Sequence, residues 1–369
     1  MKNNNIIHIF GKMEFGGAEL RTIEIMDNMQ NSFENIYFCT MSGEKGRLAK
    51  ELNEKGYNVI PCNIFSLSFP MEFMKILKKN NIDIVHSHIS IVSGYIMFLS
   101  FLAGVNKRIV HFRSSKIGKT RSVKEKIKTG VLKLLILTFA TDIVAVNRYT
   151  MVNHFKNYKK IKKCKILYNG KGMLYSEDER KIRQFKSEYS IKNDEKVIIH
   201  IGRFNEAKNH YKVISVFNSF NKIVPKSKLL LIGDNNSELG QNIQDLVKNQ
   251  NLENKVLFLG RQSNIKDFLS ISDVLLFPSY WEGLPGVVLE SLSAGIPVLG
   301  SNIGGHYEIS DTNDGITIVP LNSSDQEWSR TLKSIVYSGK QRQIADSFRK
   351  SPYYIEEVLK HFEILYDSN

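Results

Sequence analysis

Cysteine is scarce in this chain, and the few cysteines are scattered. The 369 residues include three, Cys39, Cys62 and Cys164, and no CxxC motif. This spacing disfavours a zinc-binding module and a disulfide-stabilised scaffold, and it fits a protein of a reducing compartment.

The sequence also lacks a hydrophobic run long enough to cross a bilayer. Residues 89–105 form an apolar stretch of 17 residues that contains three serines and two glycines, whereas a spanning helix needs about 20 apolar residues. We expect a buried helix of an α/β layer there, and a helix seated on a membrane is the alternative. Residues 1–10 lack the apolar core and the cleavage site of a signal peptide.

Several familiar ligand-binding motifs are missing as well. The sequence contains neither GxGxxG nor GxxxxGKS/T, so dinucleotide-binding and P-loop functions lose support. It has no recognisable zinc finger or RNA-recognition motif, which weakens a nucleic-acid-binding function. No paired aspartates of the DxD type follow an expected strand, and we therefore expect no metal at the site.

The length and composition indicate two globular domains. Hydrophobic residues make up 42% of the chain and charged residues 24%, which excludes a disordered, collagen-like or coiled-coil chain. A chain of 369 residues is comfortable for two domains of roughly 150–200 residues each.

The net charge of +14 lies entirely in the first half of the chain. Residues 1–180 hold 29 Lys and Arg against 15 Asp and Glu, whereas residues 181–369 hold 22 of each. Residues 107–133 carry ten basic side chains and one acidic one, and residues 156–171 carry seven lysines and no acid. Such segments favour anionic lipids, phosphorylated substrates or nucleic acid, and a merely solvated face is the alternative.

Short apolar segments alternate with helical patterns in both halves, which predicts two parallel α/β sheets. In the first half we expect helices at 18–29, 47–55 and 71–79, and strands at 6–10, 35–40, 58–61, 82–86, 107–111 and 142–146. In the second half we expect helices at 211–223, 265–270 and 286–294, and strands at 196–201, 228–232, 256–259, 273–277 and 297–300. The linker is expected near residues 170–190.

Two facing Rossmann-like domains would enclose a cleft, and ligands of parallel sheets bind where strands end. Gly16-Gly17-Ala18-Glu19 follows the first expected strand. The two glycines would let the backbone approach a phosphate at the start of a helix, although many strand-to-helix turns contain glycine for structural reasons alone.

Two cations follow the first strand of the second half. Arg203 and Lys208 lie in the segment GRFNEAKN, five residues apart and directly after residues 196–201. A guanidinium offers a planar fork to phosphate oxygens, and an ammonium adds a compact charge. Together they could stabilise a leaving diphosphate without a metal, and two solvated surface cations are the structural alternative.

Two carboxylates follow a later strand with a more specific spacing. Glu282 lies in the loop YWEGLPG, and Glu290 lies eight residues further on, about one turn inside the next expected helix. Carboxylates readily accept hydrogen bonds from sugar hydroxyls. A surface ion pair is the alternative role for Glu290.

These motifs, in this order and followed by AGIPV at 294–298, resemble the retaining glycosyltransferases of family 4 over nearly the whole chain. The resemblance implies the GT-B fold, a nucleotide-sugar donor as substrate and no cofactor. It implies three regions, at 1–175 for the acceptor, 176–350 for the donor, and 351–369 as a helix that crosses back to the first domain. The amphipathic pattern at 352–366 equally allows packing on the second domain.

The resemblance also assigns roles to individual residues. Arg203 and Lys208 match the pair that binds the donor diphosphate, and Glu290 matches the acid that holds the ribose hydroxyls. Glu282 matches the acid beside the donor sugar. The remaining donor-binding positions are backbone amides and a glycine loop: Gly286, Val287, Val288, Gly16 and Gly17.

One histidine resembles the family's histidine near the donor sugar. His111 ends the expected strand at 107–111, and its position raises a functional role above a structural one. His8, His86 and His88 also lie in or after strands, and we assign them no chemistry.

The family places the acceptor on the first domain, which carries the net charge. Residues 122–138 begin with cations and continue with leucines, a pattern suited to an anionic membrane surface. We therefore expect a lipid-linked saccharide acceptor, attachment at the inner face of the plasma membrane, and a role in cell-surface polysaccharide assembly, without nucleic acid as a partner. A soluble acceptor, a nucleotide-sugar epimerase of the same fold and a non-catalytic nucleic-acid binder are the alternatives.

Overall fold

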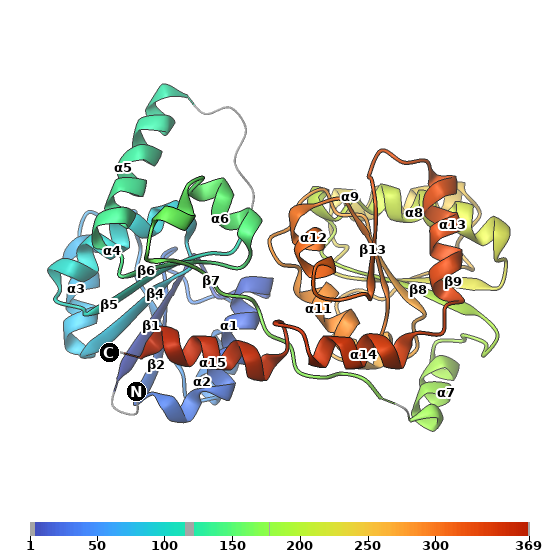
Figure 1. Cartoon of the computed structure of the whole chain (residues 1–369), viewed down its shortest axis with the longest axis horizontal. Coiled ribbons are helices and arrows are strands. Elements are labelled where there is room, and N and C mark those ends of the chain that lie inside the picture. The colour runs from blue at the N-terminus through green and yellow to red at the C-terminus, as the bar shows by residue number, and fades with distance from the viewer. Residues whose placement is uncertain (1–3, 115–121, 177, 368–369) are drawn as a thin grey trace. The chain divides into compact units, whose positions relative to one another are not determined.

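The computed structural model describes residues 4–114, 122–176 and 178–367. The chain forms two compact units (Figure 1). The first unit comprises Met1–Gly170 and Ile355–Asn369, and the second comprises Lys171–Tyr354. The predicted basic segment at 107–133 includes Lys116, Lys119 and Arg121, which lie outside the described residues.

The first unit is built on a seven-stranded parallel sheet with the order β3-β2-β1-β4-β5-β6-β7. The interior strand β1 (Asn5–Phe10) is buried at all six positions, as expected for a strand covered on both faces. The other strands are β2 (Asn35–Thr40), β3 (Asn58–Pro61), β4 (Ile82–Ser87), β5 (Lys107–Phe112), β6 (Asp142–Ala145) and β7 (Cys164–Ile166).

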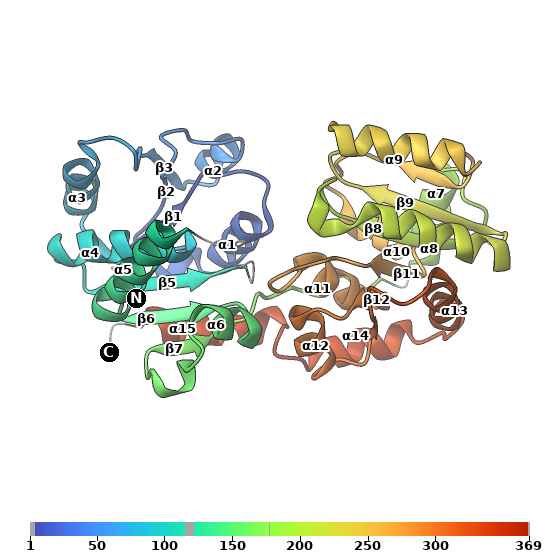
Figure 2. The same ribbon diagram turned by 90° about the horizontal axis from the view of Figure 1, so that it is seen from above.

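Helices cover both faces of this sheet (Figure 2). One face packs on α1 (Gly17–Asn28), α2 (Ala49–Glu54) and α15 (Ile355–Tyr366). The other face packs on α3 (Phe69–Lys79), α4 (Ser93–Leu102), α5 (Val123–Phe139) and α6 (Arg148–His154). The predicted buried helix within residues 89–105 is α4, and within the described part of the chain no helix has both the length and the apolarity needed to cross a bilayer.

The last helix of the chain, α15, belongs to the first unit. Its apolar positions recur at helical spacing, and Val358, Phe362, Leu365 and Tyr366 are buried in the core shared with α1 and β1. Residues nearly at the end of the chain therefore complete a core that begins at residue 6.

The second unit contains a six-stranded parallel sheet with the order β10-β9-β8-β11-β12-β13. The strands are β8 (Lys196–Ile201), β9 (Ser227–Ile232), β10 (Val256–Phe258), β11 (Val274–Phe277), β12 (Val298–Ser301) and β13 (Ile316–Val319). The helices are α7 (Glu179–Glu188), α8 (His210–Ile223), α9 (Glu238–Asn249), α10 (Ile265–Ser270), α11 (Gly286–Ser293), α12 (Gly304–Ser310), α13 (Asp325–Val336) and α14 (Gln341–Arg349). The prediction of two parallel α/β sheets is confirmed.

About half of the expected linker is a helix. Residues 179–188 form α7, whose N-terminus is capped by the Asp178 carboxylate. The rings of Phe185 and Tyr189 lie 5.0 and 5.1 Å from the ring of Phe268 on α10. The helix was not predicted because few residues of α7 are apolar. Two aromatic side chains attach it to the second unit.

Candidate active site

The candidate site of the second unit lies where β8 and β11 end. These strands are neighbours and run parallel, so the loops that follow them meet at one edge of the sheet. The backbone N–H of Tyr280, after β11, donates to the carbonyl of Ala207, after β8, over 2.9 Å. The loop with Arg203 and Lys208 is thus joined directly to the loop with Glu282.

Lys208 and Glu282 form an ion pair. The ammonium Nζ lies 2.7 Å from Glu282 Oε1, and each side chain is only 18% exposed. The same ammonium lies 4.4 Å from the centroid of the Phe277 ring, where the negative face of the ring attracts a cation. The structure therefore brings together a predicted cation and a predicted carboxylate from loops 74 residues apart.

Two glycines make this arrangement possible. A Cβ atom at Gly202 would lie 2.9 Å from the side chain of Lys208, which crosses over the glycine. A Cβ at Gly233, which has a φ of +156°, would lie 1.9 Å from the carbonyl oxygen of Gly202. The ends of β8 and β9 approach so closely there that no larger residue fits.

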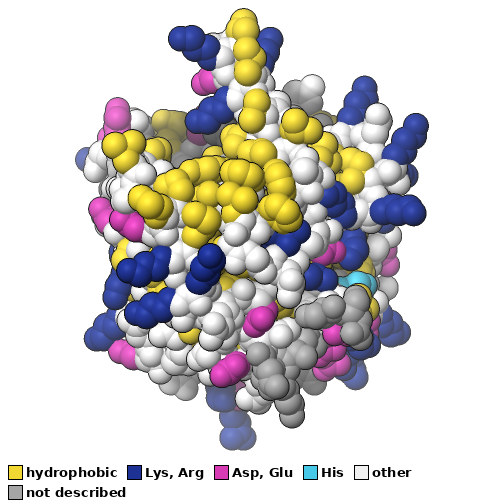
Figure 3. All heavy atoms as spheres, turned by 90° about the vertical axis from the view of Figure 1, so that its left-hand side faces the viewer, with side chains coloured by type: hydrophobic (Ala, Val, Ile, Leu, Met, Phe, Trp, Pro, Cys, Tyr) yellow, Lys and Arg dark blue, Asp and Glu magenta, His cyan; other side chains and the backbone are white. Residues whose placement is uncertain are grey.

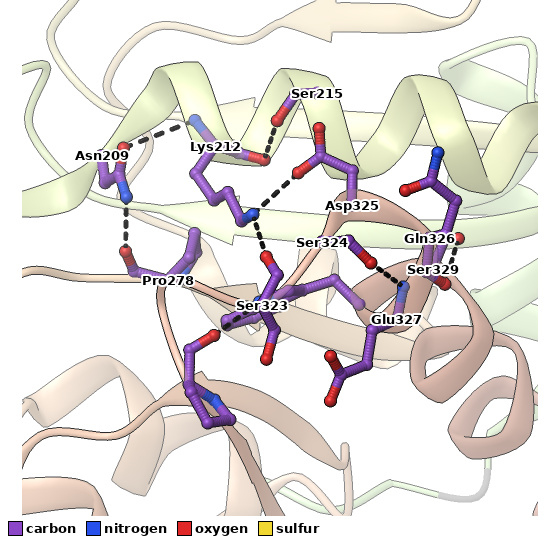
Figure 4. A network of polar contacts seen from close by, with 12 residues as sticks. Asn209, Lys212, Ser215, Pro278, Ser323, Ser324, Asp325, Gln326, Glu327 and Ser329 are labelled. Atoms are coloured by element: carbon purple, nitrogen blue, oxygen red, sulfur yellow. Dashed lines mark hydrogen bonds and ion pairs between the residues drawn. The ribbon is translucent and has the colours of Figure 1, made fainter.

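Asn209 follows Lys208 directly and fixes the backbone there, a role that was not predicted. It takes a left-handed conformation, with φ 53°, between a single 3-10 turn and α8. Its side-chain amide donates to the carbonyl of Pro278 over 3.1 Å, and its side-chain oxygen caps α8 by accepting from the N–H of Lys212 (Figure 4). Asparagine tolerates the left-handed region and caps helices, so its place after Lys208 was the available signal.

The network continues from Lys212 to α13 (Figure 4). Lys212 Nζ lies 2.7 Å from Asp325 Oδ1 and donates to the carbonyl of Ser323 over 2.9 Å. Ser324 caps α13 by accepting from the N–H of Glu327. Helix α8, which begins beside the candidate site, is therefore braced against another helix of its unit.

Three buried histidines in the second unit are neutral. Burial, with a smaller contribution from the charge of Lys208, lowers the pKa of His200 and His306 to about 4 and that of His210 to about 2. His200 Nδ1 donates to the carbonyl of Leu276 over 2.8 Å. Lys208 thus provides the positive charge here, and the histidines beside it provide none.

Helix α11 begins at the same edge and carries the remaining predicted groups. Gly286 and Val287 occupy its first turn, where backbone N–H groups have no intrahelical acceptor. The N–H of Val288 instead donates to the carbonyl of Pro285 over 3.1 Å. The amide of Val288 is therefore engaged in the turn that opens the helix, and its part in donor binding stays a prediction.

The other two predicted residues of this unit differ in burial. Glu290 lies on α11 and is half-buried, and its own carbonyl accepts from the hydroxyl of Ser293 over 2.8 Å. Arg203 is exposed on the loop after β8. Arg203, Lys208, Glu282 and Glu290 therefore all follow strands β8 and β11.

In the first unit, Gly16 and Gly17 begin α1 as predicted. Gly16 is the residue before the helix, and Gly17 is its first residue. A Cβ at Gly16 would lie 2.2 Å from the carboxylate of Glu19, whereas a Cβ at Gly17 would meet nothing within 4 Å. The backbone at Gly17 is thus accessible to a ligand at this helix start.

His111 lies inside a strand and not at its end. It pairs with Val144 in the sheet, since β5 extends to Phe112, and its side chain is fully buried. The strand expected at 107–111 is one residue longer in the structure. His86 Nε2 lies 3.1 Å from His111 Nδ1, and His86 Nδ1 lies 2.7 Å from the hydroxyl oxygen of Tyr366 on α15.

This chain of hydrogen bonds assigns the protons. The buried hydroxyl of Tyr366 needs an acceptor, and His86 Nδ1 is the one it contacts. His86 then carries its proton on Nε2 and donates to His111 Nδ1, which leaves the His111 proton on Nε2. That atom is buried and finds no hydrogen-bond partner among the described residues. His111 therefore offers an unused N–H donor.

His8 and His88 form a second chain beside the first. Arg113 Nε donates to His88 Nδ1 over 3.3 Å, and His88 Nε2 lies 3.1 Å from His8 Nδ1. Burial lowers the pKa of His8 to about 3 and that of His88 well below its ordinary value, and the charge of Arg113 adds to both effects. The same two causes lower the pKa of His111.

His8, His86 and His88 are also the one group in the described residues with the geometry of a metal site, since their ligand atoms lie within 4.8 Å of one another. Their nitrogens are engaged in the hydrogen bonds above, and Arg113 adds a positive charge that opposes a cation. This donor set fits a hydrogen-bonded cluster better than a metal. These histidines are far apart in the sequence, and the adjacent strands β1 and β4 bring their rings together.

Comparisons with known proteins agree with this architecture. The family model of glycosyl transferases group 1 matches residues 181–350. The capsular polysaccharide biosynthesis glycosyltransferase CapH of Staphylococcus aureus is 33% identical over 348 residues, 93% of either chain. The UDP-Gal:alpha-D-GlcNAc-diphosphoundecaprenol alpha-1,3-galactosyltransferase of Escherichia coli is 27% identical over 323 residues, 84% of this chain and 81% of its own. The structure of Anabaena HepE in complex with UDP has a TM-score of 0.82 at 17% identity and covers 99% of both chains.

Two parallel-sheet units with these loops define a glycosyltransferase of the GT-B fold, which confirms the predicted fold class. The chain belongs to the family of glycosyl transferases group 1. The predicted enzyme class, a glycosyltransferase, is confirmed as well.

Proposed function

We propose that this glycosyltransferase moves a sugar from a UDP- or GDP-linked donor to a lipid-linked saccharide during cell-surface polysaccharide assembly, without a metal and with retention of anomeric configuration. The observation that carries the donor half is the Lys208–Glu282 pair beside the first turn of α11. The UDP bound by HepE supports a uridine nucleotide donor. Retention rests on the family resemblance alone.

Charge stabilisation of the leaving diphosphate accounts for catalysis in this proposal. Lys208 and Arg203 offset the negative charge that develops as the sugar–oxygen bond breaks, and the amides of Gly286 and Val287 add to this at a helix start. Glu282 holds Lys208 and accepts from a donor-sugar hydroxyl, and Glu290 accepts from the ribose hydroxyls. The role of His111 near the donor sugar rests on the family resemblance alone and stays a prediction.

The donor half is tested by thermal stabilisation with UDP, GDP and their sugar conjugates. A ligand at 100 times its Kd adds about 2.7 kcal/mol of stability. We expect the wild type to gain this stability either from UDP and its sugar conjugates or from GDP and its sugar conjugates. Glu290→Gln should lose most of the stabilisation. Lys222→Met, an exposed lysine of α8 in the same unit, is the matched control and should keep it. Equal stabilisation of all three proteins would contradict the assignment.

The acceptor half rests on α5. Ser122 and Glu125 form a reciprocal cap at its start, and the helix projects from the first unit (Figure 1). Val123, Ile127 and Val131 recur every four residues and are 72%, 63% and 53% exposed. An exposed apolar stripe beside lysines suits an interfacial helix on an anionic bilayer. The diphosphoundecaprenol in the name of the Escherichia coli relative supports a lipid-linked acceptor.

Membrane attachment is tested by sedimentation with vesicles of phosphatidylglycerol and phosphatidylcholine at low salt. Each lysine near the surface contributes about 1 kcal/mol, so neutralising three of them should weaken binding roughly a hundredfold. The test variant replaces three exposed lysines of α5 by glutamine: Lys124, Lys126 and Lys128. The control replaces three exposed lysines of the second unit: Lys192, Lys222 and Lys248. Equal binding of the two variants would refute the role of α5.

A further inference from the structure

Exposed apolar side chains are distributed differently in the two units. In the first unit they gather in one patch below a projecting helix, with lysines and arginines around them (Figure 3). In the second unit the exposed large apolar side chains among the described residues are four tyrosines and one isoleucine: Tyr211, Ile223, Tyr280, Tyr307 and Tyr337. Three of them, Tyr211, Tyr280 and Tyr307, follow β8, β11 and β12, which are neighbours in the sheet. The edge that carries the candidate active site is therefore rich in exposed aromatic rings.

Tyr280 and Trp281 form a pair of rings on this edge. Their ring centroids lie 6.1 Å apart and their planes are inclined by 26°, which is within the range of offset aromatic pairs. Tyr280 is 48% exposed and Trp281 is half-buried, whereas the other tryptophan, Trp328, is fully buried in the core. Aromatic rings that stay partly exposed beside a ligand site are typical of binding surfaces.

The backbone under this pair is fixed from both neighbouring strands. The carbonyl of Ser279 accepts from the hydroxyl of Ser301, the last residue of β12, over 2.6 Å. The N–H of Tyr280 donates to the loop after β8 over 2.9 Å. One residue beyond the pair, Glu282 is held by its ion pair with Lys208. The two rings are thus carried on a fixed stretch of backbone, which lowers the ordering cost when a ligand binds them.

An aromatic surface beside a carboxylate has the chemistry of a carbohydrate site. The C–H groups on one face of a pyranose ring carry partial positive charge and pack against the negative face of an aromatic ring. The hydroxyls at the edge of the same sugar donate to a carboxylate, and Glu282 lies directly after Trp281.

We propose that Tyr280 and Trp281 form an aromatic platform that stacks against the pyranose ring of a bound sugar. An axial hydroxyl on the stacked face would hold the ring away from the platform, so the pair also selects among sugars. This inference rests on the proposed function, since that function requires the enzyme to hold a sugar ring of the donor and one of the acceptor.

Acrylamide quenching of tryptophan fluorescence tests the aromatic platform. Trp328 is fully buried, so Trp281 is the tryptophan that a quencher reaches and a ligand can shield. Trp281→Phe should remove most of the quenching, which assigns the signal. The ligands are UDP-glucose, UDP-galactose, UDP-N-acetylglucosamine and GDP-mannose, each compared with its free nucleotide. A stacked sugar should leave about half of the quenching, because it covers one of the two faces of the indole.

The arms of this experiment distinguish the two sugars. Protection by a nucleotide sugar beyond that by its free nucleotide supports the platform and assigns it to the donor. Protection by methyl glycosides of glucose, galactose or N-acetylglucosamine, added with the free nucleotide, supports it and assigns it to the acceptor. Equal protection by nucleotide and nucleotide sugar, with none by the glycosides, would overturn the platform, because a base would then cover the ring.

Thermal stabilisation separates this result from a failure of the proposed function. A nucleotide sugar that stabilises the protein while neither it nor the glycosides protect Trp281 would overturn the platform alone. A wild type that no UDP or GDP conjugate stabilises would refute the proposed function, and the platform with it.

Kinetics provide a second test with the substrate whose sugar protects Trp281. Tyr280→Ala should raise the KM for that substrate by roughly fivefold to tenfold, the size of one aromatic contact, while the Kd of the free nucleotide stays that of the wild type. Tyr280→Phe keeps the ring and should restore the KM. Tyr337→Ala, at an exposed tyrosine that ends α13, is the matched control and should change neither value. An unchanged KM for Tyr280→Ala, or an equal loss of nucleotide affinity, would overturn the assignment.

Discussion

Mildly acidic pH should destabilise this protein, because the folded protein buries several histidines in their neutral form. Four lie in the first unit and three in the second: His8, His86, His88, His111, His200, His210 and His306. Burial is the largest cause of the lowered pKa in every case. Each must gain a proton when the chain unfolds below the ordinary histidine pKa of about 6.5.

The sign and the size of the effect follow from this difference in protons bound. A histidine with a lowered pKa in the fold contributes stability above pH 6.5 and loses it as the pH falls. Between pH 7.5 and 5.5 each loses at most about 1.4 kcal/mol. Over this pH range the free energy of unfolding should fall by about 5 kcal/mol for the first unit, with four histidines, and by about 4 kcal/mol for the second, with three. Domains are commonly stable by about 5–15 kcal/mol, so either unit could reach its unfolding midpoint near pH 5.

Urea unfolding at pH 7.5, 6.5 and 5.5 measures these losses. Both tryptophans, Trp281 and Trp328, lie in the second unit, so their fluorescence reports that unit and circular dichroism reports both. His210→Phe should remove about a third of the pH dependence of the second unit, and the first unit serves as the internal control. A change below about 1 kcal/mol in both units over this range would show that the histidines are solvated or charged in the fold, and the reasoning would be wrong.

Four substitutions test the site and the packing around it. Lys208→Met should lower kcat by about 10²–10³, equivalent to about 2.7–4 kcal/mol of lost charge stabilisation. Asn209→Ala should destabilise the second unit by about 1–2 kcal/mol in urea, because a helix cap and a bond between loops are lost. Tyr366→Phe should destabilise the first unit by about 1–3 kcal/mol, because a buried histidine nitrogen loses its donor, and should alter the ¹⁵N shifts of the histidine rings. Gly94→Ala should cost about 1–3 kcal/mol, because a Cβ at residue 94 would lie 2.2 Å from the carbonyl oxygen of Leu132 on α5 and would force α4 away.

Each of these has its own control and its own contrary result. For Lys208→Met the circular dichroism should stay that of the wild type, and a tenfold or smaller loss of kcat would contradict the assigned role. Asn209→Gly keeps the left-handed backbone at no steric cost, so it should be less destabilised than Asn209→Ala; the reverse order would contradict the capping argument. Unchanged ring shifts in Tyr366→Phe would refute the proposed proton positions. Wild-type stability of Gly94→Ala would show that the helices separate easily.

Much of the fold was readable because its cause is local. Apolar runs such as 35–40 and 196–201 are buried on both faces of a parallel sheet, so their composition alone marks them as strands, and the structure has them at the same bounds. Helix α7 was missed because two aromatic side chains attach it to its unit and its other residues are mostly polar. The strand with His111 was predicted to within one residue, since its apolar run continues to Phe112.

The sequence by itself determined the two parallel sheets and the segments that follow their strands, because burial and turn chemistry act on neighbouring residues. It placed Lys208 and Glu282 after strands that a parallel sheet sets side by side. Only the tertiary structure decided what those residues contact: the ion pair across 74 positions, the role of Asn209 between two loops, and the bond from Tyr366 to a histidine 280 residues earlier. Such contacts depend on strand order and helix packing, which no short stretch of sequence encodes.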